Sequence, residues 1–167
     1  MWLAVHDLVR PKWTDQIHEE WMRNVLRNHV DISKEAVERV RQLMDAHAGD
    51  CLVRGYRHRM EALTLPDPKD VHVLAAAVES DAEAIVTWNL TDFPSKVADK
   101  HGIEVVTPDQ FVEGLLASQP VAVTLAMREH RLSLKNPSKT PEEYLGTLAK
   151  QGLSRSVLML NVWREQM

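Results

Sequence analysis

Short apolar runs alternate with helical segments over the first 117 or so residues, and this alternation most limits the folds open to the chain. The clearest strand is EAIVTW, residues 83–88, a continuously apolar run between polar turn residues. IEVVT follows at residues 103–107, and RPKW (10–13) and CLVRGY (51–56) are shorter extended or β-rich runs. Strands that alternate with helices form parallel sheets covered by helices. The sequence therefore predicts an α/β fold.

Capping residues place the helices along the chain. Hydroxyl side chains that can accept a hydrogen bond from a first-turn amide stand before three helical patterns, at Thr14, Ser33 and Thr107. After residue 119 the strands stop, and three more helical patterns follow, with KNPSKTP as the linker between the first two. We therefore expect one α/β domain over residues 1–117 and a helical C-terminal extension over residues 118–167.

Bulk composition excludes several classes of protein. The net charge of −4 excludes a strongly basic protein that coats nucleic acid. Any contact with nucleic acid therefore has to use local patches or metal ions. The single cysteine, Cys51, excludes an intrachain disulfide and a cysteine-rich zinc module. No apolar run approaches the ~18 residues of a membrane span, and the first residues lack the basic region of a signal peptide. We expect a cytoplasmic protein without membrane contact.

Two aspartates begin the helical stretch LPDPKDVHVLAAAV, residues 65–78. With Asp67 as the helix cap and Pro68 at the first position, Asp70 falls in the first turn, directly before a buried apolar stripe. Both carboxylates could serve only to satisfy free amides at the helix start. Alternatively, Asp70 is a metal ligand, since the positive end of a helix favours a charged carboxylate.

The stretch TWNLTDFP, residues 87–94, follows the clearest strand and offers a second group of polar side chains, Thr87, Asn89 and Asp92. Asn and Asp are favoured in turns, so they can be explained by turn chemistry alone. However, the carboxyl end of a strand is also where open α/β sheets place reactive groups. Both readings stay open at this stage.

A third acidic candidate lies on the helix expected over residues 14–28. At 100° per residue, Ile17 and Trp21 mark the inward face, Glu20 lies at its edge and Glu19 points into water. A carboxylate at that edge needs a partner, either a nearby Arg or Lys or a metal ion. If Glu20, Asp70 and Asp92 converge, a hard divalent cation such as Mg²⁺ or Mn²⁺ would relieve their repulsion. Such a site is suited to phosphodiester hydrolysis.

These motifs, in this order, strongly resemble the PIN-domain family, specifically its VapC-like bacterial branch. The resemblance runs from WTDQIHEEWMRN through VRGYRH to ALTLPDPKDVHVLAAAVESDAEAIVTWNLTDFP, and covers about residues 1–115. It implies a PIN-like sheet and Mg²⁺- or Mn²⁺-dependent ribonuclease activity, in many members that of a toxin held in check by an antitoxin protein. It also implies metal-site carboxylates at Glu20, Asp70 and Asp92, with supporting polar groups at Thr87, Asn89 and Asp67.

The chain departs from the family at its start, because members open with a buried central strand ending in an aspartate. This sequence opens instead with MWLAVHDLVRPKW, which aligns with the later part of the first helix. We therefore expect the central strand and first catalytic aspartate to be missing, with a sheet that closes up or is covered by a second copy or a partner. Three functions stay open: a metal-dependent ribonuclease, an inactive relative that binds a partner protein or RNA, and an unrelated α/β protein whose acidic residues are caps.

A basic loop, RGYRHR at residues 54–59, is the candidate RNA contact. Arg54, Arg57 and Arg59 could bind phosphates while Tyr56 stacks on a base. A solvated basic loop without a binding role is the alternative. His72, one residue past the helix start, could help at the site, but we expect it to be a surface histidine.

Overall fold

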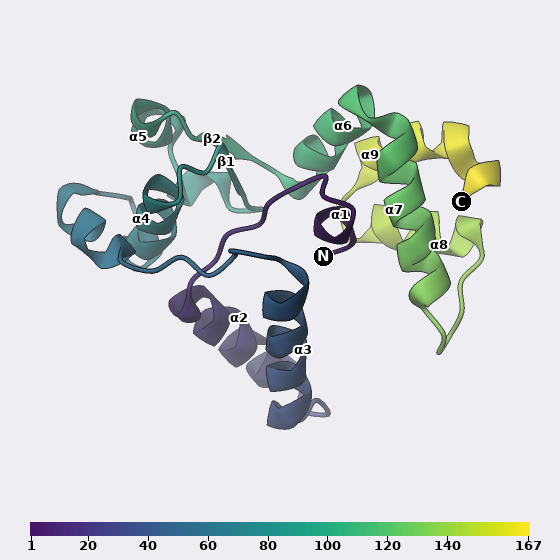
Figure 1. Cartoon of the computed structure of the whole chain (residues 1–167), viewed down its shortest axis with the longest axis horizontal. Coiled ribbons are helices and arrows are strands. Elements are labelled where there is room, and N and C mark those ends of the chain that lie inside the picture. The colour runs from purple at the N-terminus through teal and green to yellow at the C-terminus, as the bar shows by residue number, and fades with distance from the viewer. The chain divides into compact units, whose positions relative to one another are not determined.

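The computed structural model describes all 167 residues and divides into two compact units (Figure 1). We call one the α4 unit, comprising Arg10–Ile85 and Asn89–Val105, and the other the C-terminal unit, comprising Met1–Val9, Val86–Trp88 and Val106–Met167. The domain boundary expected between residues 117 and 118 stays a prediction. None of the helices combines the length and the apolar character needed to cross a membrane.

The three predicted hydroxyl caps are confirmed. Thr14 accepts a hydrogen bond from the amide of Ile17 (3.1 Å) at the start of α2 (Asp15–Asn28). Ser33 does the same for α3 (Lys34–His47), and Thr107 forms a reciprocal capping box at the start of α6 (Pro108–Ser118). The other helices are α1 (Trp2–Val5), α4 (Val71–Glu79), α5 (Ser95–Ala98), α7 (Pro120–Ser133), α8 (Pro141–Lys150) and α9 (Ser154–Leu160).

The α/β class is confirmed, with a sheet of only two short parallel strands, β1 (Ala84–Val86) and β2 (Glu104–Val106). The amide of Glu104 donates to the carbonyl of Glu83 at 2.9 Å. The runs RPKW and CLVRGY do not join this sheet. They meet each other in one isolated parallel bridge, between Trp13 and Leu52. The sequence predicted one sheet, whereas the structure has two separate strand pairings.

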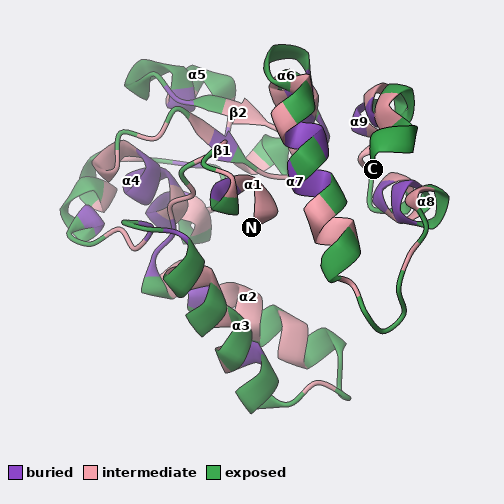
Figure 2. Cartoon of the chain, turned by 45° about the vertical axis from the view of Figure 1, so that its right-hand side comes forward, coloured by how far each residue is buried: buried purple, intermediate pink, exposed green.

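Helix α4 forms the centre of its unit because its side chains are small and apolar. Leu74 and Ala75 are fully buried, and Figure 2 shows α4 coloured largely as buried. One side of the helix packs with Ile85 and Ile103 beside the strands, and another packs with Tyr56. The buried alanines in the second half of α4 let the helix pack closely against its neighbours.

The C-terminal unit is a helical cluster with its own core, in which Leu116, Val123, Tyr144 and Leu160 are almost completely buried. A buried carboxylate ties two of its helices together. Asp109, in α6, accepts hydrogen bonds from the amides of Arg155 (3.0 Å) and Ser156 (2.9 Å) and from the Ser156 hydroxyl (2.7 Å). Asp109 thus satisfies first-turn amides of α9 from outside that helix.

Asp109→Ala is expected to lower the free energy of unfolding by about 3 kcal/mol at neutral pH, because hydrogen bonds to a charged group are lost. Burial alone raises the pKa of Asp109, but the bonds from Ser156 and Arg155 outweigh it and hold that pKa below its usual value. The contribution of Asp109 is therefore complete at neutral pH and is lost as pH falls through its folded-state pKa. Urea denaturation from pH 7 to about pH 3 measures this, with exposed Asp99→Ala as the control. A loss that does not shrink in acid would contradict the assignment.

Candidate acidic site

The two aspartates before α4 have different structural roles. Asp67 caps the 3-10 turn Pro68–Asp70, where its carboxylate accepts a hydrogen bond from the amide of Lys69 at 2.9 Å. Asp70 occupies the cap position of α4 itself, yet its side chain makes no capping hydrogen bond. Helix capping therefore explains Asp67, but it does not explain the carboxylate of Asp70.

Asp70 lies among other carboxylates of the α4 unit. Burial raises the pKa of Asp70, and the negative charge of Asp92 raises it further. The charges of Asp67 and Glu20 act in the same direction, and Asp70 also shares a hydrogen bond with the Asp92 side chain. Acidic residues that are far apart in sequence are thus close enough here to disfavour the ionised form of Asp70.

The turn after β1 holds Asp92 in place. The side-chain amide of Asn89 donates a hydrogen bond to the Asp92 carboxylate, and the Thr91 hydroxyl donates to Asn89 Oδ1 at 2.8 Å. Turn chemistry and proximity to Asp70 therefore occur together. Thr87 belongs to the other unit, where its backbone amide donates to the carbonyl of Val106 at 2.9 Å.

Glu20 has a partner, and it is neither an arginine nor a lysine. His72 Nε2 lies 3.0 Å from Glu20 Oε1 and 3.1 Å from Oε2. Because a carboxylate oxygen accepts, Nε2 carries the hydrogen. The expectation that His72 is a surface residue is wrong, since its side chain is 0% exposed. Its other ring nitrogen, Nδ1, is buried without a hydrogen-bond partner.

The donor set suits a hard cation, although the structure contains no cluster of three His, Cys, Asp or Glu side chains arranged around a common metal position. Mg²⁺ is usually held by one or two carboxylates and keeps several water ligands. Asp70 and Asp92, which share a hydrogen bond, offer such a pair. A cation between them would relieve the repulsion that raises the pKa of Asp70. The residues present therefore fit Mg²⁺ or Mn²⁺.

A groove of about 560 Å³ lies in the α4 unit beside Glu20. Arg54 and Arg57 of the basic loop line it, whereas Arg59 binds Glu79 at 2.8 Å. Tyr56 is buried and its hydroxyl donates to Gln16 at 3.3 Å, so base stacking by Tyr56 is wrong.

Sequence reasoning missed two further cations of this groove, Arg23 and Lys69. The spacing of Arg23, three residues after Glu20 on one helix, could have identified it. Lys69 lies between the two aspartates, and nothing about a single lysine at such a position indicates a binding role.

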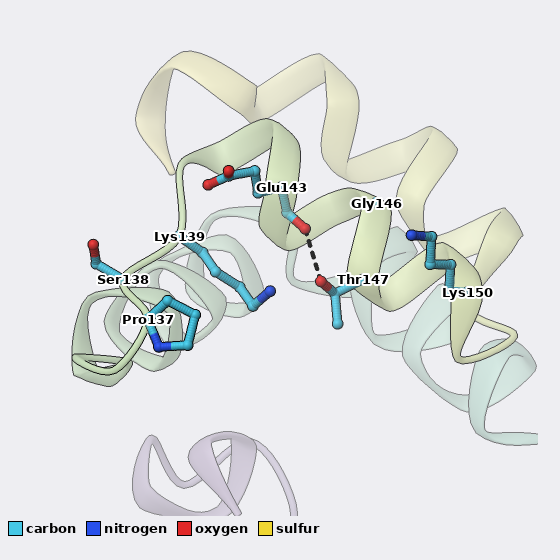
Figure 3. Close-up of a pocket in the computed structure, with 7 residues that line it drawn as sticks. All are labelled: Pro137, Ser138, Lys139, Glu143, Gly146, Thr147 and Lys150. Carbon is cyan, nitrogen blue, oxygen red and sulfur yellow. Dashed lines mark hydrogen bonds between the residues drawn. The ribbon is translucent and has the colours of Figure 1, made fainter.

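A second cavity, of about 320 Å³, lies in the C-terminal unit and includes none of the predicted site residues. It runs along α8 and the preceding linker, and Figure 3 shows Lys139, Glu143 and Lys150 at its edges. Thr147, also at this cavity, donates its hydroxyl hydrogen to the carbonyl of Glu143 at 2.8 Å. This polar cavity lacks the crowding of like charges found around Asp70.

Comparison with known proteins gives two family matches. The model described as "PIN domain" matches residues 3–91, and the one described as "VapC50 C-terminal domain" matches residues 108–161. The first match includes Glu20 and Asp70 and ends one residue before Asp92.

A relative from Mycobacterium tuberculosis carries the name "Putative ribonuclease VapC50". It is 38% identical over 86 residues, which are 50% of this chain and 49% of the relative. The match thus spans about half the length of each protein. No solved structure matches significantly.

Glu20→Ala is expected to destabilise the protein by about 1–3 kcal/mol, because both ring nitrogens of buried His72 then lack a partner. Glu20→Gln should recover most of this loss, since its amide oxygen can still accept from Nε2–H. Urea denaturation measures both variants, with Glu19→Ala on the exposed side of α2 as the matched control. Equal stability of Glu20→Ala and Glu19→Ala would show that the pair does not form.

Asp70→Asn is expected to stabilise the metal-free protein, because it removes a partly buried charge from among like charges. A melting temperature higher by roughly 2–4 °C corresponds to about 1 kcal/mol in a chain of this size. Since the pKa of Asp70 is raised in the folded state, the parent should gain stability as pH falls through that pKa, and the variant should gain less. Thermal denaturation in EDTA tests this against Asp99→Asn. A lower melting temperature for Asp70→Asn would contradict the crowding.

Proposed function

Because the chain belongs to the PIN-domain family, we propose that it is a divalent-metal-dependent endoribonuclease, the toxin of a toxin–antitoxin pair. The observation that carries the proposal is the crowding of Asp70 by Asp92, Asp67 and Glu20. Capping does not require this arrangement, whereas a cation site does. The name of the M. tuberculosis relative supports ribonuclease activity.

In this proposal Asp70 and Asp92 would hold Mg²⁺ or Mn²⁺, and Glu20 would be the third carboxylate near the ion. The bound ion would supply charge stabilisation for hydrolysis of an RNA phosphodiester. The chain's own contribution is orientation: Asn89 donates to the carboxylate of Asp92, and His72 donates to that of Glu20. Thr87 remains a proposed supporting group, and Asp67 shapes the turn that presents Asp70.

The alternative is an inactive PIN-like protein that binds a partner protein or RNA. It requires neither a bound cation nor an ionised Asp70, so a cleavage assay distinguishes the two. An antitoxin protein, a second copy of this chain and a cytoplasmic location belong to the same proposal, by the resemblance to VapC-like toxins.

The purified chain is expected to cleave RNA in Mn²⁺ and to stop in EDTA. Asp70→Asn and Asp92→Asn should each slow cleavage by at least about 100-fold, since charge stabilisation by the ion is worth several kcal/mol. Asp99→Asn, purified in parallel, should cleave like the parent. Binding of RNA without cleavage would favour the inactive alternative. If Asp70→Asn cleaved as fast as the parent, the site assignment would be wrong.

A further inference from the structure

The groove beside Glu20 is lined mainly by charged side chains. Four cations line it. Arg23 comes from α2, Arg54 and Arg57 come from the loop and 3-10 turn around Tyr56, and Lys69 comes from the turn before α4. All four are exposed, and no ion pair joins any of them to a carboxylate. The chain as a whole has a net charge of −4, whereas the charge of this surface is locally positive because four cations lie there without ion-pair partners.

The three carboxylates of the groove offset the four cations only in part, and none of them forms an ion pair with any of the four. Asp15 is bound by Arg41 at 2.5 Å, outside the set of four. Glu20 is bound by His72 at 3.0 Å. Only Glu19 remains among the acidic lining residues without an ion-pair partner. The groove therefore keeps an excess of positive charge, and an anion is the ligand that would compensate it.

The groove shares one residue with the acidic group and includes the neighbour in sequence of another. Glu20 belongs to both, and Lys69 directly precedes Asp70 in the turn that Asp67 caps. A chain of phosphates could thus place one phosphate at the carboxylates, where a cation would meet it, and its neighbours along the arginines. Arginine binds phosphate oxygens with two parallel N–H donors.

We propose that this groove binds the sugar–phosphate backbone of single-stranded RNA next to the phosphate that is cleaved. This inference rests on the proposed function. Val53 is the only aliphatic side chain of the lining, so the groove lacks the apolar pockets with which peptide-binding grooves select side chains. Tyr56 is buried and bonded to Gln16, so the groove binds phosphates rather than bases, with little dependence on sequence.

The test measures fluorescence anisotropy of a labelled single-stranded RNA in EDTA, where cleavage does not interfere. The double variant Arg54→Glu/Arg57→Glu is expected to bind at least tenfold more weakly. Its plot of log affinity against log salt should be shallower by roughly 1.4, the slope that two phosphate contacts contribute in a single strand. Arg54→Lys/Arg57→Lys should retain most of the affinity.

The matched control is Lys34→Glu/Arg39→Glu, which changes the net charge equally on exposed positions of α3. It should bind within about twofold of the parent. An equal loss of RNA affinity in both double variants would show that only the overall charge matters, and would overturn the proposal. Unchanged RNA binding by the groove variant would also overturn it. A poly-glutamate peptide that displaces RNA more strongly than unlabelled RNA of equal length would overturn it in favour of an acidic protein partner. Circular dichroism verifies that every variant is folded.

The two proposals fail separately. Asp70→Asn should bind RNA in EDTA at least as tightly as the parent, because it loses a negative charge beside the groove. If the parent binds RNA through the arginines but cleaves nothing in Mn²⁺, the ribonuclease proposal fails and the groove stands. If the parent cleaves RNA and the groove variant still binds and cleaves normally, the groove proposal fails alone.

Discussion

The hydrogen bond between buried His72 and Glu20 is the contact on which the site geometry depends. It joins the first turn of α4 to the middle of α2, two helices that are 52 residues apart at this contact. Around His72 the side chains of α4 are small and buried, so the helix cannot rotate without opening its packing. The position of Glu20 relative to Asp70 follows from that fixed rotation, because His72 and Asp70 are only two residues apart.

The same packing places Asp70 among other carboxylates. A set of carboxylates that raises the pKa of one of its members stores repulsion in the folded state. Structural carboxylates elsewhere in the chain show the opposite behaviour. Asp109 is buried, yet donors surround it and its pKa is lowered. The two aspartates thus differ in their surroundings: hydrogen-bond donors favour the charged form of Asp109, whereas partial burial and neighbouring carboxylates disfavour that of Asp70.

Sequence reasoning succeeded where the physical cause was local. The Thr14, Ser33 and Thr107 caps act within three residues, so the starts of α2, α3 and α6 could be predicted directly. Strand pairing is not local. RPKW and CLVRGY have the right composition, but nothing in either run specifies that they pair with each other and not with β1 and β2.

The environment of His72 is equally nonlocal. Its position in the first turn of α4 indicated exposure, and only the approach of Glu20 from another helix makes burial acceptable. The acidic candidates could be named from the sequence because a helix start and the turn after a strand are local features. Their partners could not, since a histidine or a lysine beside an aspartate is common in any sequence.

Glu20 and Arg23 show how negative and positive side chains are arranged along α2. They lie three residues apart on α2, a spacing at which a carboxylate and a guanidinium commonly pair. No ion pair joins them, and the Glu20 carboxylate accepts a hydrogen bond from His72 instead. Both residues line the groove, and Glu20 also lies close enough to Asp70 to raise its pKa. In the two proposals made above, this one helix would present a carboxylate to a cation and a guanidinium to the RNA phosphates, and hydrolysis of a phosphodiester uses both charges.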